Sequence, residues 1–186
     1  PALQAPVTTV EASALDRVEG GRAVAASGDA YDLDALVFAT GFEATEPPYA
    51  QLVYGREGVS LSEHWRLGMQ AFDSIAVAGF PNLFSINGPN TSLGHNSIVY
   101  IIESQVDYIL GALDHLAEHG FDVIEPTREA EDAYVDRIQA DARGTVWIDG
   151  GCKSWYVDQR SGKLTLIWPD FGFAFRDENG AFDAEG

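Results

Sequence analysis

The most regular hydrophobic pattern lies in the middle of the chain, where apolar residues recur at steps of three and four positions. These residues are Ile98, Ile102, Val106, Ile109, Leu113 and Leu116. Such a repeat places them on one face of a helix. Asn96 or Ser97 can cap the start of this helix, and Gly120 can end it. The pattern therefore predicts one long helix between these caps.

A second helix is predicted between Thr127 and Arg143. Thr127 is a good N-cap residue, and the acidic Glu129 and Glu131 suit the positive end of the helix dipole. Gly144 stops the pattern. Before the long helix, residues 61–67 predict a short helix with Trp65 on its apolar side.

Short apolar segments separated by glycine predict β-structure elsewhere. The predicted strands are residues 7–10, 33–39, 75–78 and 83–86, with hairpins over 15–26 and 153–168. The run at 33–39 is almost continuously apolar, which favours a strand covered on both faces. From Thr145 onward we expect a return to β-structure, with a loose acidic tail after Arg176. Together these elements predict an α/β fold with β-hairpin segments and one long helix.

Composition narrows the class of protein. Hydrophobic residues make up 46% and charged residues 22% of the 186 residues, which excludes a wholly disordered chain. The longest apolar run, residues 98–102, is far shorter than the roughly 20 residues of a membrane helix. The formal net charge of −18 disfavours nucleic acid and anionic membranes as partners. The single Cys152 cannot form an internal disulfide, so we expect a cytoplasmic protein.

Complete catalytic motifs are absent from the sequence. It contains no G-x-G-x-x-G, no Walker loop, no H-E-x-x-H, no C-x-x-C and no G-x-S-x-G. His115 and His119 could share a metal ion, but the sequence offers no third ligand, so a solvated helix end is favoured. We therefore expect no metal site, and we expect Cys152 to be an inert thiol.

Residues 79–97 form the most suggestive segment for binding. A predicted strand runs into a loop of small residues, which leads directly to the start of the long helix. This arrangement aims free backbone N–H groups and a positive dipole end at whatever lies above the loop. This pattern is compatible with two interpretations: a site for an anionic or electron-rich ligand, and a purely structural loop.

Several short motifs in a fixed order resemble one enzyme family. Residues 34–42, DALVFATGF, resemble the D-x-x-[VI]-x-A-T-G-[FY] segment of flavin-containing and Baeyer–Villiger monooxygenases. LSEHW at 61–65, GFPNLF at 79–84, GPNT at 88–91, SWY at 154–156 and WP at 168–169 follow in the family's order. The chain therefore resembles the C-terminal portion of such an enzyme, a partial FAD/NAD(P)-binding (Rossmann-like) flavoprotein fold. Because it begins with Pro1, we expect a piece of something larger or a removed start.

The resemblance implies three parts: the last strands of the NADP-binding domain (1–38), the C-terminal part of the FAD-binding domain (39–125), and a helical and β extension over the active site (126–186). It also implies roles for nine residues around FAD, NADP and the substrate. Those beside the flavin are Thr40, Gly41, Phe42, Asn96, Ser97 and Ile98. Those lining the substrate side are Ser92 and Leu93. Trp155 resembles a tryptophan on a mobile loop over NADP, although an aromatic at this position is more often part of a core.

The implied reaction uses NADPH and O₂ to insert one oxygen atom next to a ketone. The family's nucleotide motifs and its catalytic arginine have no counterpart here, so we expect no catalytic residue in this chain. The expected partners are a small ketone and the N-terminal half of the same enzyme, and a homo-oligomer is also expected. Two alternatives stay open: an N- or S-oxygenating flavin monooxygenase, and a non-catalytic binding or interaction module.

Overall fold

The computed structural model describes residues 4–39, 44–92, 94–95, 97–151 and 154–184. The chain divides into two compact units, Pro1–Phe42 and Glu43–Gly186. Among the described residues, no helix is long and apolar enough to cross a membrane.

The first unit holds a three-stranded antiparallel sheet of β1 (Leu15–Glu19), β2 (Arg22–Ala25) and β3 (Ala30–Asp32), in that order. Gly20 and Gly21 form the turn between β1 and β2 with φ angles of 55° and 84°, a region that glycine adopts without strain. The predicted hairpin is therefore confirmed, and β3 extends it by one strand.

Two predicted strands of this unit are wrong. Residues 7–10 and 33–39 are not strands, and the side chains of Val37 and Phe38 are 84% and 70% exposed. A strand that is covered on both faces needs pairing partners on each side. No segment within the described ranges pairs with residues 33–39 as a strand.

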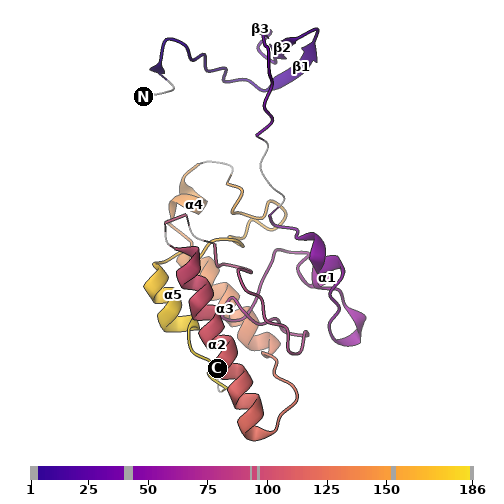
Figure 1. Cartoon of the computed structure of the whole chain (residues 1–186), viewed down its shortest axis with the longest axis vertical. Helices are drawn as coiled ribbons and strands as arrows, with labels where there is room; N and C mark the ends of the chain where they lie inside the picture. The colour runs from indigo at the N-terminus through magenta and orange to yellow at the C-terminus, as the bar shows by residue number, and fades with distance from the viewer. Residues whose placement is uncertain (1–3, 40–43, 93, 96, 152–153, 185–186) are drawn as a thin grey trace. The chain divides into compact units, whose positions relative to one another are not determined.

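The regular elements described in the second unit are helices, joined by long loops (Figure 1). Its helices are η2 (Pro48–Gln51), η3 (Arg56–Gly58), α1 (Leu61–His64), α2 (Ile98–His119), α3 (Arg128–Asp141), α4 (Val146–Asp149) and α5 (Gly172–Asn179). The long predicted helix is confirmed, since α2 ends at Gly120 in the left-handed conformation with φ 67°. The second predicted helix is α3, which Thr127 caps by accepting a hydrogen bond from the N–H of Ala130.

One core lies where α2, α3 and α5 pack together. Its buried members are Ile101, Tyr134, Ile138, Trp168 and Phe175. The ring of Trp168 meets that of Phe175 edge-on, with centroids 5.2 Å apart. The expectation of a loose tail after Arg176 is therefore wrong up to Asn179, because the buried Phe175 anchors α5 and Arg176 forms an ion pair with Asp107 at 2.9 Å.

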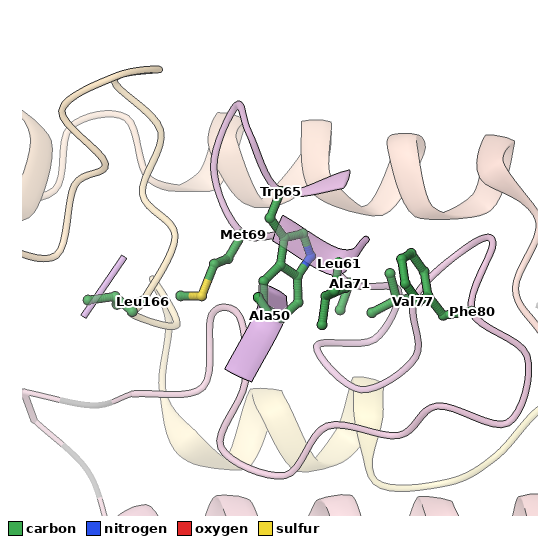
Figure 2. Close-up of a cluster of buried hydrophobic side chains, with 8 residues drawn as sticks. All are labelled: Ala50, Leu61, Trp65, Met69, Ala71, Val77, Phe80 and Leu166. Carbon is green, nitrogen blue, oxygen red and sulfur yellow. The ribbon is translucent and has the colours of Figure 1, made fainter. Parts of the chain in front are cut away.

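A second core surrounds α1 (Figure 2). It contains Ala50, Leu61, Trp65, Met69, Ala71, Val77, Phe80 and Leu166. The predicted short helix is present but ends at His64, and Trp65 caps it with only 3% of its surface exposed. The Trp65 indole N–H donates to the carbonyl of Gln70 at 2.8 Å.

The short strands predicted in this unit are reduced to single bridges. Such bridges join Phe72 to Ala76, Ala76 to Phe84, and Val157 to Leu164. Positive φ angles at Asp73, Ser74, Asn82 and Asn87 turn the backbone too often for longer pairing. The expected return to β-structure from Thr145 is also wrong at its start, where α4 forms.

Candidate functional site

A side chain of α2 binds the backbone at the start of the loop that leads into this helix. Gln105 is fully buried. Its Oε1 accepts a hydrogen bond from the N–H of Asn87 at 2.9 Å. Its Nε2 donates to the carbonyls of Ser74 at 2.9 Å and Ser85 at 3.1 Å. The third turn of α2 therefore fixes the backbone from which the loop departs.

The same loop also pairs with a segment far along the chain, residues 164–168. Ser92 donates its N–H to the carbonyl of Leu166 at 2.8 Å and accepts a hydrogen bond from the N–H of Trp168 at 3.1 Å. These bonds form a parallel bridge between Ser92 and Ile167. The backbone of Ser92 is thereby fixed, and its side chain is half-buried.

The start of α2 is left without a side-chain cap. Ser97 occupies the N-cap position, but its side chain makes no capping hydrogen bond, unlike Ser60 before α1 and Thr127 before α3. The first N–H groups of a helix need partners, and they attract negative charge. Ile98 is 37% exposed at this point. The helix start can therefore receive an anionic or electron-rich group.

Aromatic side chains border the loop. The ring of His95 lies stacked 6.4 Å from that of Trp147, and its Nε2 is 2.9 Å from the carbonyl of Asp170. A Cβ atom on Gly94 would lie 2.8 Å from the Trp147 ring, so only glycine fits there without a shift.

Trp155 lies on the surface rather than in a core. Its side chain is 56% exposed, and its ring is 4.5 Å from that of Tyr156. The ring of Tyr156 in turn meets Trp147 edge-on at 5.2 Å. An exposed indole on this aromatic base can cover a ligand and offer it one N–H donor.

The turn that follows Trp155 is closed by a buried carboxylate. Asp158 is fully buried, and its Oδ1 accepts a hydrogen bond from the N–H of Arg160 at 2.8 Å. Burial alone raises the pKa of Asp158, but hydrogen bonds from the side chain and backbone of Arg160 and from Ser161 outweigh it and leave the pKa below its ordinary value.

Comparison with known proteins shows which enzymes this chain is similar to. No family model matches the chain. It is 40% identical over 184 residues to a Baeyer–Villiger monooxygenase of Pseudomonas aeruginosa and 41% identical over 184 residues to one of Streptomyces coelicolor. These matches cover 99% and 98% of the chain. Over almost its whole length, the chain matches the C-terminal portion of Baeyer–Villiger monooxygenases.

Solved structures of two enzymes share the fold. Cyclohexanone monooxygenase from Rhodococcus sp. Phi1 bound to NADP⁺ has a TM-score of 0.72 and 27% identity over 88% of this chain. The enzyme OTEMO in complex with FAD and NADP has a TM-score of 0.68 and 27% identity over 88% of this chain. The predicted fold class, part of a flavin monooxygenase fold, is thereby confirmed. The chain spans about a third of the length of these relatives, 35% of each of the two Baeyer–Villiger monooxygenases.

The residues predicted for the Baeyer–Villiger site fall into two groups. Ser92, Ser97, Ile98 and Trp155 are described by the structure. The others lie outside the described residues: Thr40, Gly41, Phe42, Leu93 and Asn96. Ser92 is brought to the segment 164–168, which also bridges to Val157, two positions after Trp155. The roles of all nine residues stay predictions.

The two histidines considered as a metal pair, His115 and His119, have contacts compatible with a solvated helix end. The rings of His115 and His119 lie 4.2 Å apart, and His119 Nδ1 is 2.9 Å from the carbonyl of His115. No group of three metal-ligating side chains exists within the described residues. Cys152 lies outside them.

An acidic group with a raised pKa, the partly buried Asp73 near α2, has no signal in the sequence. Burial raises the pKa of Asp73 from its ordinary value of 3.8 to about 7, against the opposing effects of Arg137 and of a hydrogen bond with Tyr108. Burial, the negative charge of Asp73 and their hydrogen bond raise the pKa of Tyr108 as well. Glu178 and Asp183 add further negative charge that favours the protonated Asp73.

Gln105 and Asn90 were also missed as residues that shape the loop. One signal could have identified Gln105: a polar residue within an apolar helix pattern is either buried and hydrogen-bonded or misplaced. Asn90 belongs to the GPNT motif, but nothing in the sequence shows that its amide reaches residues 164–167.

Proposed function

We propose that the chain is the C-terminal part of an FAD- and NADPH-dependent Baeyer–Villiger monooxygenase. The whole enzyme would insert one oxygen atom of O₂ next to a ketone carbonyl and release an ester or lactone. The observation that carries this proposal is the match of 40% identity over 99% of the chain to a Baeyer–Villiger monooxygenase. The expected division into residues 1–38, 39–125 and 126–186 is part of the same proposal.

The start of α2 fits a role beside FAD. When bound, FAD would take electrons from NADPH and activate O₂. The uncapped N–H groups that follow Ser97 would stabilise negative charge on the flavin ring by hydrogen bonding and by the helix dipole. Asn96 and Ile98 would face the same ring, while Thr40, Gly41 and Phe42 would line the flavin from the preceding crossover.

The exposed Trp155 fits a role over NADP. Its indole N–H would donate to the cofactor, and its ring, supported by Tyr156, would exclude water from the site. Ser92 and Leu93 would line the substrate side, where the backbone of Ser92 is already fixed by Leu166 and Trp168.

The N-terminal part of the enzyme is the proposed partner of these residues. It would supply the glycine-rich cradles for the two pyrophosphates, for which this sequence has no motif. It would also supply the catalytic arginine of the family. We further propose that the enzyme works in the cytoplasm, and a homo-oligomer stays a prediction.

The reaction class is tested with the complete enzyme, NADPH and O₂ on a panel of cyclic and aryl ketones, amines and sulfides. We expect NADPH oxidation that depends on ketone, with an ester or lactone as product. Oxidation of amines and sulfides without any ketone product would assign the enzyme to the N- or S-oxygenating branch. The absence of flavin-dependent NADPH oxidation would favour a non-catalytic module.

A further inference from the structure

Three stretches of backbone meet beside the proposed cofactor site. Residues 164–168 lie in the middle, because they pair with Ser92 on one side and with residues 156–157 on the other. On the second side, Val157 bridges to Leu164, and the N–H of Thr165 donates to the carbonyl of Tyr156 at 3.3 Å. The loop that bears Ser92 and the hairpin that bears Trp155 are thereby joined through one shared segment.

One buried side chain reinforces this junction. Asn90 is 4% exposed, and its Nδ2 donates to the carbonyls of Leu164 at 2.7 Å and Ile167 at 3.0 Å. Its backbone N–H donates to the carbonyl of Thr165 at 2.9 Å. A single residue of the loop therefore makes three hydrogen bonds to the central segment.

The backbone of Asn90 is suited to this task. Its φ angle is 55°, in the left-handed region where asparagine is better tolerated than most residues. Leu164 is also bound by Gln139 of α3, whose Nε2 donates to the same carbonyl at 3.0 Å and whose Oε1 accepts the Leu164 N–H at 2.9 Å. Residues 164–168 are thus hydrogen-bonded both to the loop, through Asn90, and to α3, through Gln139.

We propose that Asn90 is a positioning residue that fixes the substrate-side loop in register with the hairpin that carries Trp155. The proposal rests on the proposed function for the roles of Ser92 and Trp155. Its physical basis is the two amide hydrogen bonds of Asn90, because loss of either leaves a buried carbonyl without that partner. Without them the two loops would shift independently, and the shielding of the site by Trp155 would become less complete.

The structural part is tested by amide hydrogen exchange on the 186-residue chain. The Asn90→Gly variant keeps the left-handed backbone but removes the side-chain amide. We expect the N–H groups of Ser92, Thr165 and Trp168 to exchange at least about tenfold faster in this variant. Asn90→Asp, which turns a carboxylate toward two carbonyls, should have a larger effect. Wild-type exchange in Asn90→Gly would overturn the proposal, since the backbone conformation alone would then hold the junction.

Asn82 provides a matched control. It also has a left-handed φ of 58°, and its Nδ2 donates to the carbonyl of Asp122 at 3.0 Å. Its Oδ1 accepts from the N–H of Ile124 at 2.9 Å. These bonds reach the segment after the C-terminal end of α2, away from Ser97. Asn82→Gly should speed exchange there and leave Ser92 and Trp168 unchanged.

The functional part is tested in the complete monooxygenase by the amount of ester formed per NADPH consumed. We expect Asn90→Gly to lower this ratio at least about twofold and to raise the KM for NADPH more than it lowers kcat. Asn82→Gly should change neither, even if it lowers the melting temperature. Equal ratios in the two variants would overturn the positioning role.

Failure of the proposed function gives a different result. A wild-type enzyme that forms no ester, or a Trp155→Ala variant with an unchanged KM for NADPH, would refute the proposed site itself. In the first case the exchange measurement on Asn90→Gly still decides whether Asn90 holds the junction.

Discussion

Individual buried polar side chains determine much of how this chain is held together. Gln105 and Asn90 bind only backbone groups, and each joins segments that are distant in the sequence. Asp73 differs, because it is a carboxyl group whose pKa is raised by burial to about 7. A group of this kind makes the free energy of unfolding depend on pH.

The Asp73→Asn variant tests this dependence. The raised pKa means that the folded chain keeps the Asp73 proton between about pH 4 and pH 7 while the unfolded chain loses it. The contribution of Asp73 to stability is therefore present at low pH and is lost as the pH rises to about 7, by up to about 4 kcal/mol. We expect the variant to be more stable than wild type at pH 8, and close to it at pH 4, in urea unfolding. Asparagine suits the φ angle of 51° at this position.

The exposed Asp132 of α3 is the control for Asp73. Asp132→Asn removes one negative charge without changing a buried group, so its effect should be small and should not change sign with pH. An Asp73→Asn variant that parallels wild type at every pH would contradict the raised pKa.

Among the elements, the two longest helices and the hairpin of β1 and β2 were predicted correctly, whereas the other strands were not. The limits of α2 and α3 follow from local signals, since Thr127 and Gly120 act on hydrogen bonds within a few residues. Strands depend on partners elsewhere in the chain. Residues 33–39 have strand-like composition, yet no described segment pairs with them as a strand. The helix α5 was missed because the contacts that anchor it are tertiary: the burial of Phe175 against Trp168 and the ion pair between Arg176 and Asp107.

The difference between local and tertiary signals also determines how much of the site could be predicted from the sequence. The start of α2 and the presence of a loop before it follow from the local pattern around Ser97. The joining of Ser92 to residues 164–168 could not be predicted, because parallel pairing between distant segments leaves no local signature. The family resemblance supplied the roles of these residues, and the structure supplied the contacts of those it describes.

The N-caps of α2 and α3 differ, and this difference predicts unequal effects on stability when each is removed. Thr127→Ala should destabilise the chain by about 1 kcal/mol, because it removes the hydrogen bond from the Ala130 N–H at 3.1 Å. Ser97→Ala should cost clearly less, because the Ser97 side chain makes no capping bond. Chemical unfolding of both variants measures the difference. Equal losses would show that Ser97 caps α2 in solution, and the N–H groups proposed for the flavin would then be occupied.

At the scale of the whole molecule, the chain would take part in the proposed reaction only together with the rest of the enzyme. The chain matches 35% of the length of its Baeyer–Villiger relatives and contains no motif for a pyrophosphate cradle. Purified alone, it should therefore hold FAD poorly and be colourless.

The most direct test of the central claim is to run the complete enzyme with NADPH and a cyclic ketone under isotopically heavy oxygen gas, and to weigh the product. We expect a lactone that carries one heavy oxygen atom in its ring, formed only when NADPH is present. A ketone that is returned unchanged, or an oxidised product whose new oxygen comes from water, would contradict it.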